Sequence, residues 1–176
     1  MKAVVRLVIW LIMLAGGVWG GLLLDRQLFP VIYRSPEVHL AGFIIGFFLL
    51  KTVMTVSRNT GRTLAKYGRE GELPRMETNR LVTKGVYLYM RHPMHLGLLL
   101  FPFAIAFMAG SPSFILIIAP SEVIFMLLMI KWVEEPEAIR KFGAAYLKYA
   151  QHTPWFCLKR SCLQALFNKV GKTENK

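Results

Sequence analysis

Four apolar stretches dominate the chain, and charged or turn-forming residues separate them. They run from about Ala3 to Leu24, from Val38 to Val56, from His95 to Ala109 and from Ser113 to Val133. An α-helix rises 1.5 Å per residue, so crossing about 30 Å of hydrocarbon takes about 20 apolar residues. The third stretch reaches this length only if it includes Pro93 or residues before it. The pattern predicts an all-α polytopic membrane protein with four transmembrane helices, the last two joined by a tight turn at Gly110-Ser111-Pro112.

Composition strengthens the membrane interpretation. Of the 176 residues, 55% are hydrophobic and 18% are charged, whereas soluble domains average about 45–50% and about 25%. This balance excludes a disordered or collagenous chain. Lys and Arg number 22 against 10 Asp and Glu, a formal net charge of +12. Nucleic-acid-binding proteins are also basic, but they do not need long apolar runs, so we expect a bilayer as partner and no nucleic acid.

The basic residues also predict the orientation in the membrane. Eight Lys and Arg lie between Ser57 and Met94, and eight more follow Glu134, but only Arg26 and Arg34 lie in the first loop. Basic residues mark the side that is not translocated. Both termini and the long middle loop are therefore expected in the cytoplasm, which agrees with an even number of spans.

The N-terminal stretch resembles a signal peptide, because Lys2 and Arg6 precede a long apolar run. No small-x-small cleavage site follows it. We therefore expect a retained first span.

The apolar stretches contain a few residues that do not suit a simple bilayer helix. Pro102 and Pro120 should kink the third and fourth helices, either as packing geometry alone or to open a cavity between them. Lys51 lies near the end of the second stretch and can extend to the interface. Glu122 falls near the middle of the fourth stretch, and an acid at that depth is a candidate substrate-binding residue. The alternative is a buried carboxyl hydrogen-bonded to a neighbouring helix.

The segment from Asn79 to Gly97 precedes the third predicted helix. Gly85 permits a turn, and Pro93 suits a first helical turn, which places Arg91 and His92 beside the helix start. A helix N-terminus offers unpaired N–H groups and a partial positive charge to an anionic ligand. His92 and His95 could instead form a metal pair. A third ligand of matching spacing is missing and Pro93 disturbs the helix between them, so no metal is expected.

A second polar block, Glu134-Glu135-Pro136-Glu137, closes the fourth predicted helix. Acids at the C-terminal end of a helix are unfavourable for its dipole. A cationic partner should therefore compensate them. The alternative is that they are solvated and paired with Lys131 or Arg140, which contributes little to stability.

Four short motifs follow one another along half of the chain, from about Gly71 to Phe156. They are Leu-Val-Thr-x-Gly-x-Tyr from Leu81, Arg-His-Pro-Met-x-x-Gly from Arg91, Glu-Glu at Glu134, and Phe-Gly-x-x-Tyr-x-x-Tyr from Phe142. Together they resemble the isoprenylcysteine carboxyl methyltransferase and phospholipid methyltransferase superfamily of integral membrane enzymes. The order of the motifs around a helical hairpin makes the resemblance specific.

The resemblance implies an S-adenosylmethionine-dependent methyltransferase whose cofactor lies between the Arg-His-Pro segment and the Glu-Glu pair and enters from the cytosol. It assigns to cofactor binding Leu81, Val82, Tyr87, His92, Pro93, Met94, His95, Glu134 and Glu135. Arg91 would act as the catalytic residue, by binding a carboxylate or polarising the acceptor. The two acids would bind the cationic part of the methyl donor.

Two positions depart from the family pattern. His95 stands where the family usually has tyrosine. Members specific for prenylcysteine have an arginine four residues before the first glutamate, and this chain has Ile130 there. The implied acceptor is therefore a membrane lipid or a lipidated small molecule, whether a prenylcysteine carboxylate, a phospholipid amine or a similar group.

The tail after Pro154 is expected to form an amphipathic helix on the inner leaflet. Its apolar positions recur at helical spacing, at Trp155, Leu158, Cys162, Leu166 and Val170, and its end from Lys172 to Lys176 should fray. The spacing of Cys157 and Cys162 fits neither a disulfide framework nor a zinc ligand pair, so we expect free thiols.

The predicted organisation is an N-terminal transmembrane hairpin over residues 1–56, a methyltransferase core over 57–156 and a basic tail over 157–176. The competing hypothesis is a small four-helix transporter or scaffold that uses Glu122 and Lys51 as transport charges. An inactive family member that binds lipid is a third.

Overall fold

The computed structural model describes residues 3–72 and 78–168. Within these ranges the chain forms helices and loops and no β-strand, so the all-α prediction is confirmed for them. The chain divides into two compact units. Unit 1 comprises Met1–Val53 and Leu98–Lys131, and unit 2 comprises Met54–Gly97 and Trp132–Lys176.

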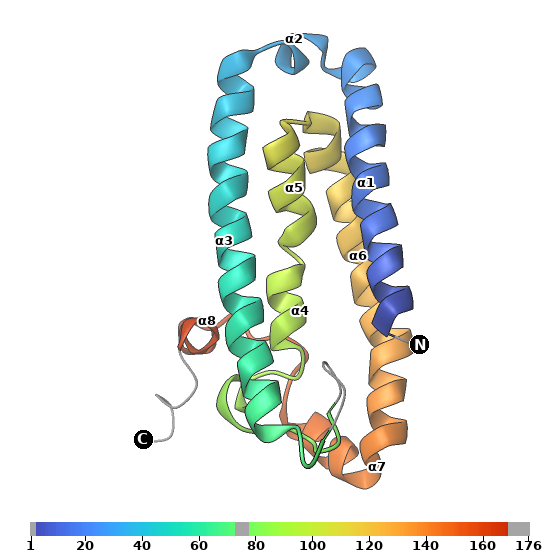
Figure 1. Cartoon of the computed structure of the whole chain (residues 1–176), viewed down its shortest axis with the longest axis vertical. Helices are drawn as coiled ribbons and strands as arrows, with labels where there is room; N and C mark the ends of the chain where they lie inside the picture. Colours follow the sequence, from blue (N-terminus) through green and yellow to red (C-terminus); the bar gives the residue numbers. More distant parts are fainter. Residues whose placement is uncertain (1–2, 73–77, 169–176) are drawn as a thin grey trace. The chain divides into compact units, whose positions relative to one another are not determined.

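Unit 1 holds most of the apolar helices. It contains α1 (Ala3–Leu28), α2 (Pro30–Tyr33), the first part of α3 (Pro36–Tyr67), α5 (Phe101–Ala109), the π-helical turn η2 (Phe114–Ile118) and α6 (Ala119–Met129). The short helix α2 links α1 to α3 (Figure 1). Close packing depends on glycine, as in other membrane helix pairs. A Cβ on Gly17 would lie 2.6 Å from the Phe114 ring, and one on Gly46 would lie 2.6 Å from the carbonyl oxygen of Ala104.

The turn between α5 and η2 is tied to the end of α1. Gly110 ends α5 in a left-handed conformation with φ of 62°, which confirms the turn predicted at this position. Asp25 is fully buried, and its Oδ1 accepts the backbone N–H of Ser113 at 2.7 Å. This bond satisfies one of the unpaired N–H groups at the helix start.

Among the residues that the structure describes, three helical stretches are long and apolar enough to cross a membrane, namely Val5–Leu28, Pro36–Tyr67 and Phe114–His152. The third predicted span is a shorter apolar stretch, Pro93–Ala109, which is split into α4 (Pro93–Leu98) and α5. Of the two prolines predicted to kink these helices, Pro102 lies in the first turn of α5 and Pro120 in the first turn of α6, where proline is tolerated. The outer faces of these helices expose large apolar side chains such as Phe43, Phe48 and Leu116, as a lipid environment requires.

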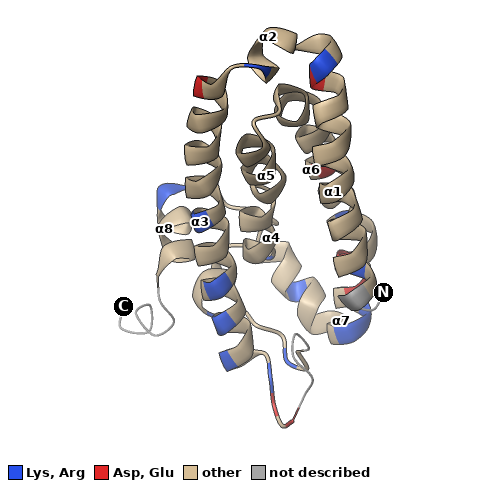
Figure 2. Cartoon of the chain, turned by 45° about the horizontal axis from the view of Figure 1, so that its top comes forward, with Lys and Arg blue, Asp and Glu red and all other residues tan. Residues whose placement is uncertain are grey.

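Unit 2 is built around a smaller core. It contains the last part of α3, the 3₁₀ turn η1 (Gly85–Leu88), α4, α7 (Glu135–His152) and α8 (Arg160–Phe167), and η3 (Ile130–Glu134) precedes α7. The core residues are Val56, Val82, Val86, Tyr87, Met90, Cys162, Ala165 and Leu166. Helix α3 continues well past the predicted apolar stretch, and this extension carries Arg58, Arg62 and Lys66 (Figure 2).

The prediction that Glu134 and Glu135 end a helix was wrong. Helical structure continues through η3 into α7, so Glu134 directly precedes α7 and Glu135 is its first residue. The apolar run stops at Val133, but the backbone does not, since Pro136 is tolerated in a first helical turn. Because no helix ends at these acids, the unfavourable position at a helix C-terminus does not arise.

The expected tail helix is also shorter than predicted. Helix α8 begins at Arg160, because Lys159 is extended with φ of −62° and ψ of 147°, so Trp155 and Leu158 precede it. Val170 and Lys172–Lys176 lie outside the described residues. Cys162, Ala165 and Leu166 are buried in the core of unit 2. This part of the apolar face therefore packs against protein.

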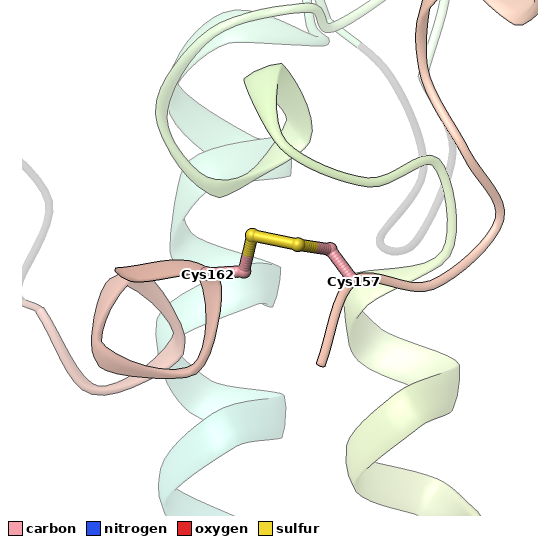
Figure 3. Close-up of a disulfide and its surroundings, with 2 residues drawn as sticks. All are labelled: Cys157 and Cys162. Atoms are coloured by element: carbon pink, nitrogen blue, oxygen red, sulfur yellow. A yellow bond between two sulfur atoms is a disulfide. The ribbon is translucent and has the colours of Figure 1, made fainter. Parts of the chain in front are cut away.

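The expectation of free thiols was wrong as well. Cys157 and Cys162 form a disulfide (Figure 3). The loop before α8 turns into the first helical turn, which brings the two Cα atoms to 5.8 Å, within the range that a disulfide needs. The sequence separation of five residues between the two cysteines does not by itself indicate this turn.

Candidate functional site

Two segments that are far apart in the sequence meet within unit 2. Arg91, His92 and His95 come from the segment that begins α4, and Glu134 and Glu135 come from the start of α7. Arg91 Nη1 lies 2.6 Å from Glu135 Oε2, and His92 Nε2 lies 2.6 Å from Glu135 Oε1. His95 Nε2 lies 3.0 Å from Glu134 Oε1. We call these five side chains the His–Glu cluster.

Glu135 is the centre of the His–Glu cluster. Besides Arg91 and His92, it accepts a hydrogen bond from the Tyr146 hydroxyl at 2.6 Å. Its side chain is 13% exposed and that of Arg91 is 11% exposed. A carboxylate at this depth is stable because cationic and hydrogen-bonding partners replace water. A cationic partner was predicted for the two acids, and Arg91 is that partner for Glu135.

The surroundings of His92 favour its neutral form. Burial lowers the pKa of His92, against the opposing effects of its hydrogen bond to Glu135 and the charges of the two acids. An ionised carboxylate only accepts hydrogen bonds, so Nε2 carries the proton and donates to Glu135. The other ring nitrogen, Nδ1, then presents a lone pair and lies 3.9 Å from Glu134 Oε2.

The backbone around His92 is fixed by the segment that follows α7. The N–H groups of Arg91 and His92 donate to the carbonyl oxygens of Pro154 and Trp155 at 2.9 and 3.1 Å. The Trp155 ring also lies edge-on to His92, with centroids 6.2 Å apart. Because α4 starts at Pro93, the N–H of Leu96 bonds to the carbonyl oxygen of His92. The proline thus begins the short helix that carries His95.

A kink in α7 brings its second half to the cluster. Gly143 has φ of 56° and ψ of −135° inside the helix, a conformation that is essentially restricted to glycine. In a straight helix, Glu135 and Tyr146 would lie about 16 Å apart along the axis. The bend allows the hydrogen bond between them. Tyr149, one turn further, donates to the carbonyl oxygen of Tyr87, so α7 is also tied to η1.

The remaining residues predicted for cofactor binding have mixed environments. Val82 and Tyr87 belong to the hydrophobic core and are 6% and 7% exposed, and burial raises the pKa of the Tyr87 phenol. Pro93 is fully buried. Leu81 and Met94 are half-buried, so they are more accessible to a ligand.

Glu122 does not belong to the His–Glu cluster. It lies on α6 in unit 1 and is 6% exposed. A Cβ on Gly17 would come within 2.9 Å of its Oε1, so α1 passes directly over this carboxyl group. Ile130, at the position of the family arginine, is fully buried.

Sequence reasoning missed three aromatic residues of the site, namely Tyr146, Tyr149 and Trp155. The two tyrosines were part of a quoted motif, and their spacing of three residues places them on one helix face. That signal could have identified them as partners of a common group. Trp155 had been assigned to a tail helix, and no local pattern indicated its contact with His92.

Comparisons with known proteins agree with the four motifs. The family model described as phospholipid methyltransferase matches residues 38–145. Protein-S-isoprenylcysteine O-methyltransferase B of Arabidopsis thaliana is 32% identical over 116 residues, which are 65% of this chain and 55% of that protein. The chain thus spans about half the length of this curated relative.

Among solved structures, a eukaryotic intramembrane Ras methyltransferase, isoprenylcysteine carboxyl methyltransferase, aligns with 90% of this chain and 54% of its own. The TM-score is 0.49 and the sequence identity is 20%. The family model covers more than half of this chain. The protein therefore belongs to the phospholipid methyltransferase family, as the order of its motifs predicted.

Proposed function

We propose that the protein is an integral membrane methyltransferase that transfers a methyl group from S-adenosylmethionine to a lipid or lipid-like acceptor. The observation that carries the proposal is the His–Glu cluster, in which residues 91–95 meet residues 134–135 within unit 2. These are the two segments that the family resemblance assigns to the methyl donor. Neither segment needs this arrangement to form a helix.

The residues of the cluster fit the chemical groups of the methyl donor. S-adenosylmethionine carries a sulfonium, an ammonium group and a carboxylate. Glu134 is 21% exposed and is the more accessible of the two acids, so it is suited to a cation. The Nε atom of Arg91 is buried and has no hydrogen-bond partner among the described residues. A carboxylate is a natural acceptor for this N–H group.

When bound, S-adenosylmethionine supplies an electrophilic methyl group that already carries its leaving group. The protein therefore mainly orients the reactants and excludes water. Arg91 would orient a carboxylate, and Glu135 with Tyr146 would hold Arg91 and His92 in place. Leu81 and Met94 would contact apolar parts of the ligand. No covalent nucleophile is required.

The acceptor would enter from the bilayer and the methyl donor from the cytosol. The large apolar side chains exposed on the helices and the basic middle loop and tail support this orientation. A buried isoleucine at position 130 offers no charge to a prenylcysteine carboxylate. The proposed acceptors therefore include phospholipid amines as well as lipidated carboxylates.

Calorimetry on the protein in detergent micelles tests the donor site. We expect binding of S-adenosylmethionine and of its demethylated product, and we expect Glu134→Ala and His92→Ala each to weaken it at least about tenfold, because each removes a polar side chain that the proposal places against the donor. Glu137→Ala and His152→Ala are the matched controls outside the cluster. Absence of binding at millimolar ligand, or unchanged affinity in both cluster variants, would contradict the proposal.

The acceptor is identified by a second experiment. The protein is incubated with a labelled methyl donor and a total membrane lipid extract, and the labelled species is then isolated. We expect the label in a lipid or lipidated small molecule. Label that enters no lipid fraction would count against the acceptor class.

A further inference from the structure

Three side chains of the His–Glu cluster are arranged as a set of metal ligands. His92, His95 and Glu134 each offer one ligand atom, and these atoms lie within 4.8 Å of one another. Zinc binds nitrogen and oxygen ligands at about 2.0–2.1 Å, so tetrahedral ligands lie about 3.3 Å apart. The observed separations from the Glu134 carboxylate are 3.0 Å to His95 Nε2 and 3.9 Å to His92 Nδ1. Small side-chain adjustments would reach the required geometry.

The orientation of His92 is the one that a metal site requires. Its Nε2–H donates to Glu135 at 2.6 Å, which directs the Nδ1 lone pair toward Glu134. Histidine ligands of metals commonly donate their other N–H to a carboxylate, which fixes the ring. Glu135 is fixed in turn by Arg91 and Tyr146. The supporting shell of such a site is therefore already assembled.

Both sequence arguments against a metal are answered by the structure. Pro93 does not interrupt a helix between the histidines, because α4 begins at that residue, and the two rings lie 5.6 Å apart. The missing third ligand is Glu134, which is far away in sequence. Motifs of closely spaced ligands could not identify Glu134, because it lies far along the chain from the two histidines.

We propose that His92 Nδ1, His95 Nε2 and the Glu134 carboxylate bind a divalent cation of the zinc class, and that this cation competes with the methyl donor. Imidazole and carboxylate ligands suit zinc and its neighbours in the first transition row. Three protein ligands leave a fourth position open to water, as in catalytic rather than structural zinc sites. The metal site stands on the geometry alone, whereas the competition rests on the proposed function.

Competition follows from charge as well as from shared residues. The two carboxylates of Glu134 and Glu135 outnumber the single guanidinium of Arg91, so these three side chains have a net negative charge, which favours a cationic methyl donor. A bound divalent cation reverses the sign of this charge and occupies Glu134. By linkage, the methyl donor must weaken the binding of the metal by the same factor.

Metal binding is measured first, without the methyl donor. Zn²⁺ is titrated calorimetrically into the full-length protein, purified in detergent without a polyhistidine tag, and Co²⁺ absorption reports the coordination geometry. We expect one Zn²⁺ per chain and a tetrahedral Co²⁺ spectrum, with no binding of Mg²⁺, which prefers oxygen ligands. Failure of the protein to bind Zn²⁺ or Co²⁺ would overturn the inference.

Variants locate the metal. His95→Tyr introduces the residue that the family resemblance places there and removes one ligand, and Glu134→Gln removes another. Both should weaken Zn²⁺ binding at least about tenfold, while His152→Ala and Glu137→Gln should not. Circular dichroism and gel filtration check the fold. If one of the two cluster variants misfolds, the Zn²⁺ affinity of the other tests the site. Unchanged Zn²⁺ affinity in a folded cluster variant would overturn the site.

The competition is measured by titrating S-adenosylmethionine with and without saturating Zn²⁺. We expect Zn²⁺ to raise the dissociation constant of the donor about tenfold in the unmodified protein and not in His95→Tyr. An unchanged donor affinity would overturn the competition. A protein that binds Zn²⁺ but no S-adenosylmethionine would sustain the metal site and refute the proposed function, and the converse result would refute the metal site alone.

Discussion

Two glutamates, one in each unit, have opposite surroundings. Glu135 in unit 2 accepts hydrogen bonds from Arg91, His92 and Tyr146. Glu122 in unit 1 lies against α1, and its Oε2 has no hydrogen-bond partner among the described residues. Both belong to the continuous helical stretch Phe114–His152. The position of an acid along an apolar run therefore does not predict its hydrogen-bond partners, because these come from distant segments of the chain.

The largest effect should come from Glu135→Gln. The substitution keeps the size of the side chain but leaves the buried Arg91 guanidinium without its countercharge. Breaking a buried pair from one side costs about 3 kcal/mol or more, so thermal unfolding in detergent should shift down by several degrees. Glu137→Gln, in the same turn of α7, is the control and should cost less than about 1 kcal/mol. Equal losses in the two variants would contradict the special role of the contacts that Glu135 makes with Arg91, His92 and Tyr146.

Gly143→Ala should have the next largest effect. A Cβ on Gly143 meets nothing within 4 Å, but φ is +56°, so the cost is backbone strain of about 1–3 kcal/mol. Relief of this strain would straighten α7 and separate Tyr146 from Glu135. Gly16→Ala is the matched control, since its Cβ is equally uncrowded and it lies in the regular helix α1, where alanine is favoured. A stable Gly143→Ala protein with unchanged donor affinity would show that the kink is dispensable.

Tyr146→Phe tests one donor to Glu135 in isolation. The loss of a hydrogen bond to a charged group should cost about 1.5–3 kcal/mol. Tyr149→Phe, which removes a bond to a neutral backbone oxygen, should cost about 1 kcal/mol. The free energy of unfolding of the two variants measures this difference. If Tyr149→Phe lowered the free energy of unfolding more than Tyr146→Phe, the contact of α7 with η1 would matter more than the hydrogen bond to the Glu135 carboxylate.

Glu122→Gln should have the smallest effect on stability. Glutamine keeps the size of the side chain, and the Oε2 atom that it replaces has no hydrogen-bond partner among the described residues. We expect a change within about 0.5 kcal/mol, with folding intact, so that turnover of the true substrate can be compared directly. A loss as large as that of Glu135→Gln would mean that Glu122 has an essential partner.

Hydropathy located the helices well but not their ends. The turn at Gly110 was predicted from its turn-forming residues. Helices α3 and α7 extend beyond their apolar runs, because a helix continues through polar sequence when tertiary contacts support it. On α3, Asn59 donates a side-chain hydrogen bond to the carbonyl oxygen of Leu166, a contact that no local pattern contains.

The residues of the site were named from motifs, but their arrangement was not derivable from spacing. Arg91 and Glu135 are 44 residues apart, and only the fold brings them together. The positive φ of Gly143 is similarly invisible in an alanine-rich helical pattern. The expectation that Cys157 and Cys162 are free thiols failed because it rested on their spacing alone, which does not show how the loop before α8 turns.

The disulfide between Cys157 and Cys162 bears on membrane topology. Cystines persist in oxidising compartments and are rare in the cytosol, where glutathione keeps thiols reduced. The distribution of Lys and Arg predicts the cytosolic side for this same segment. The thiol content of the pair in native membranes, measured by maleimide capture before lysis, therefore reports which face of the bilayer the carboxyl-terminal region occupies.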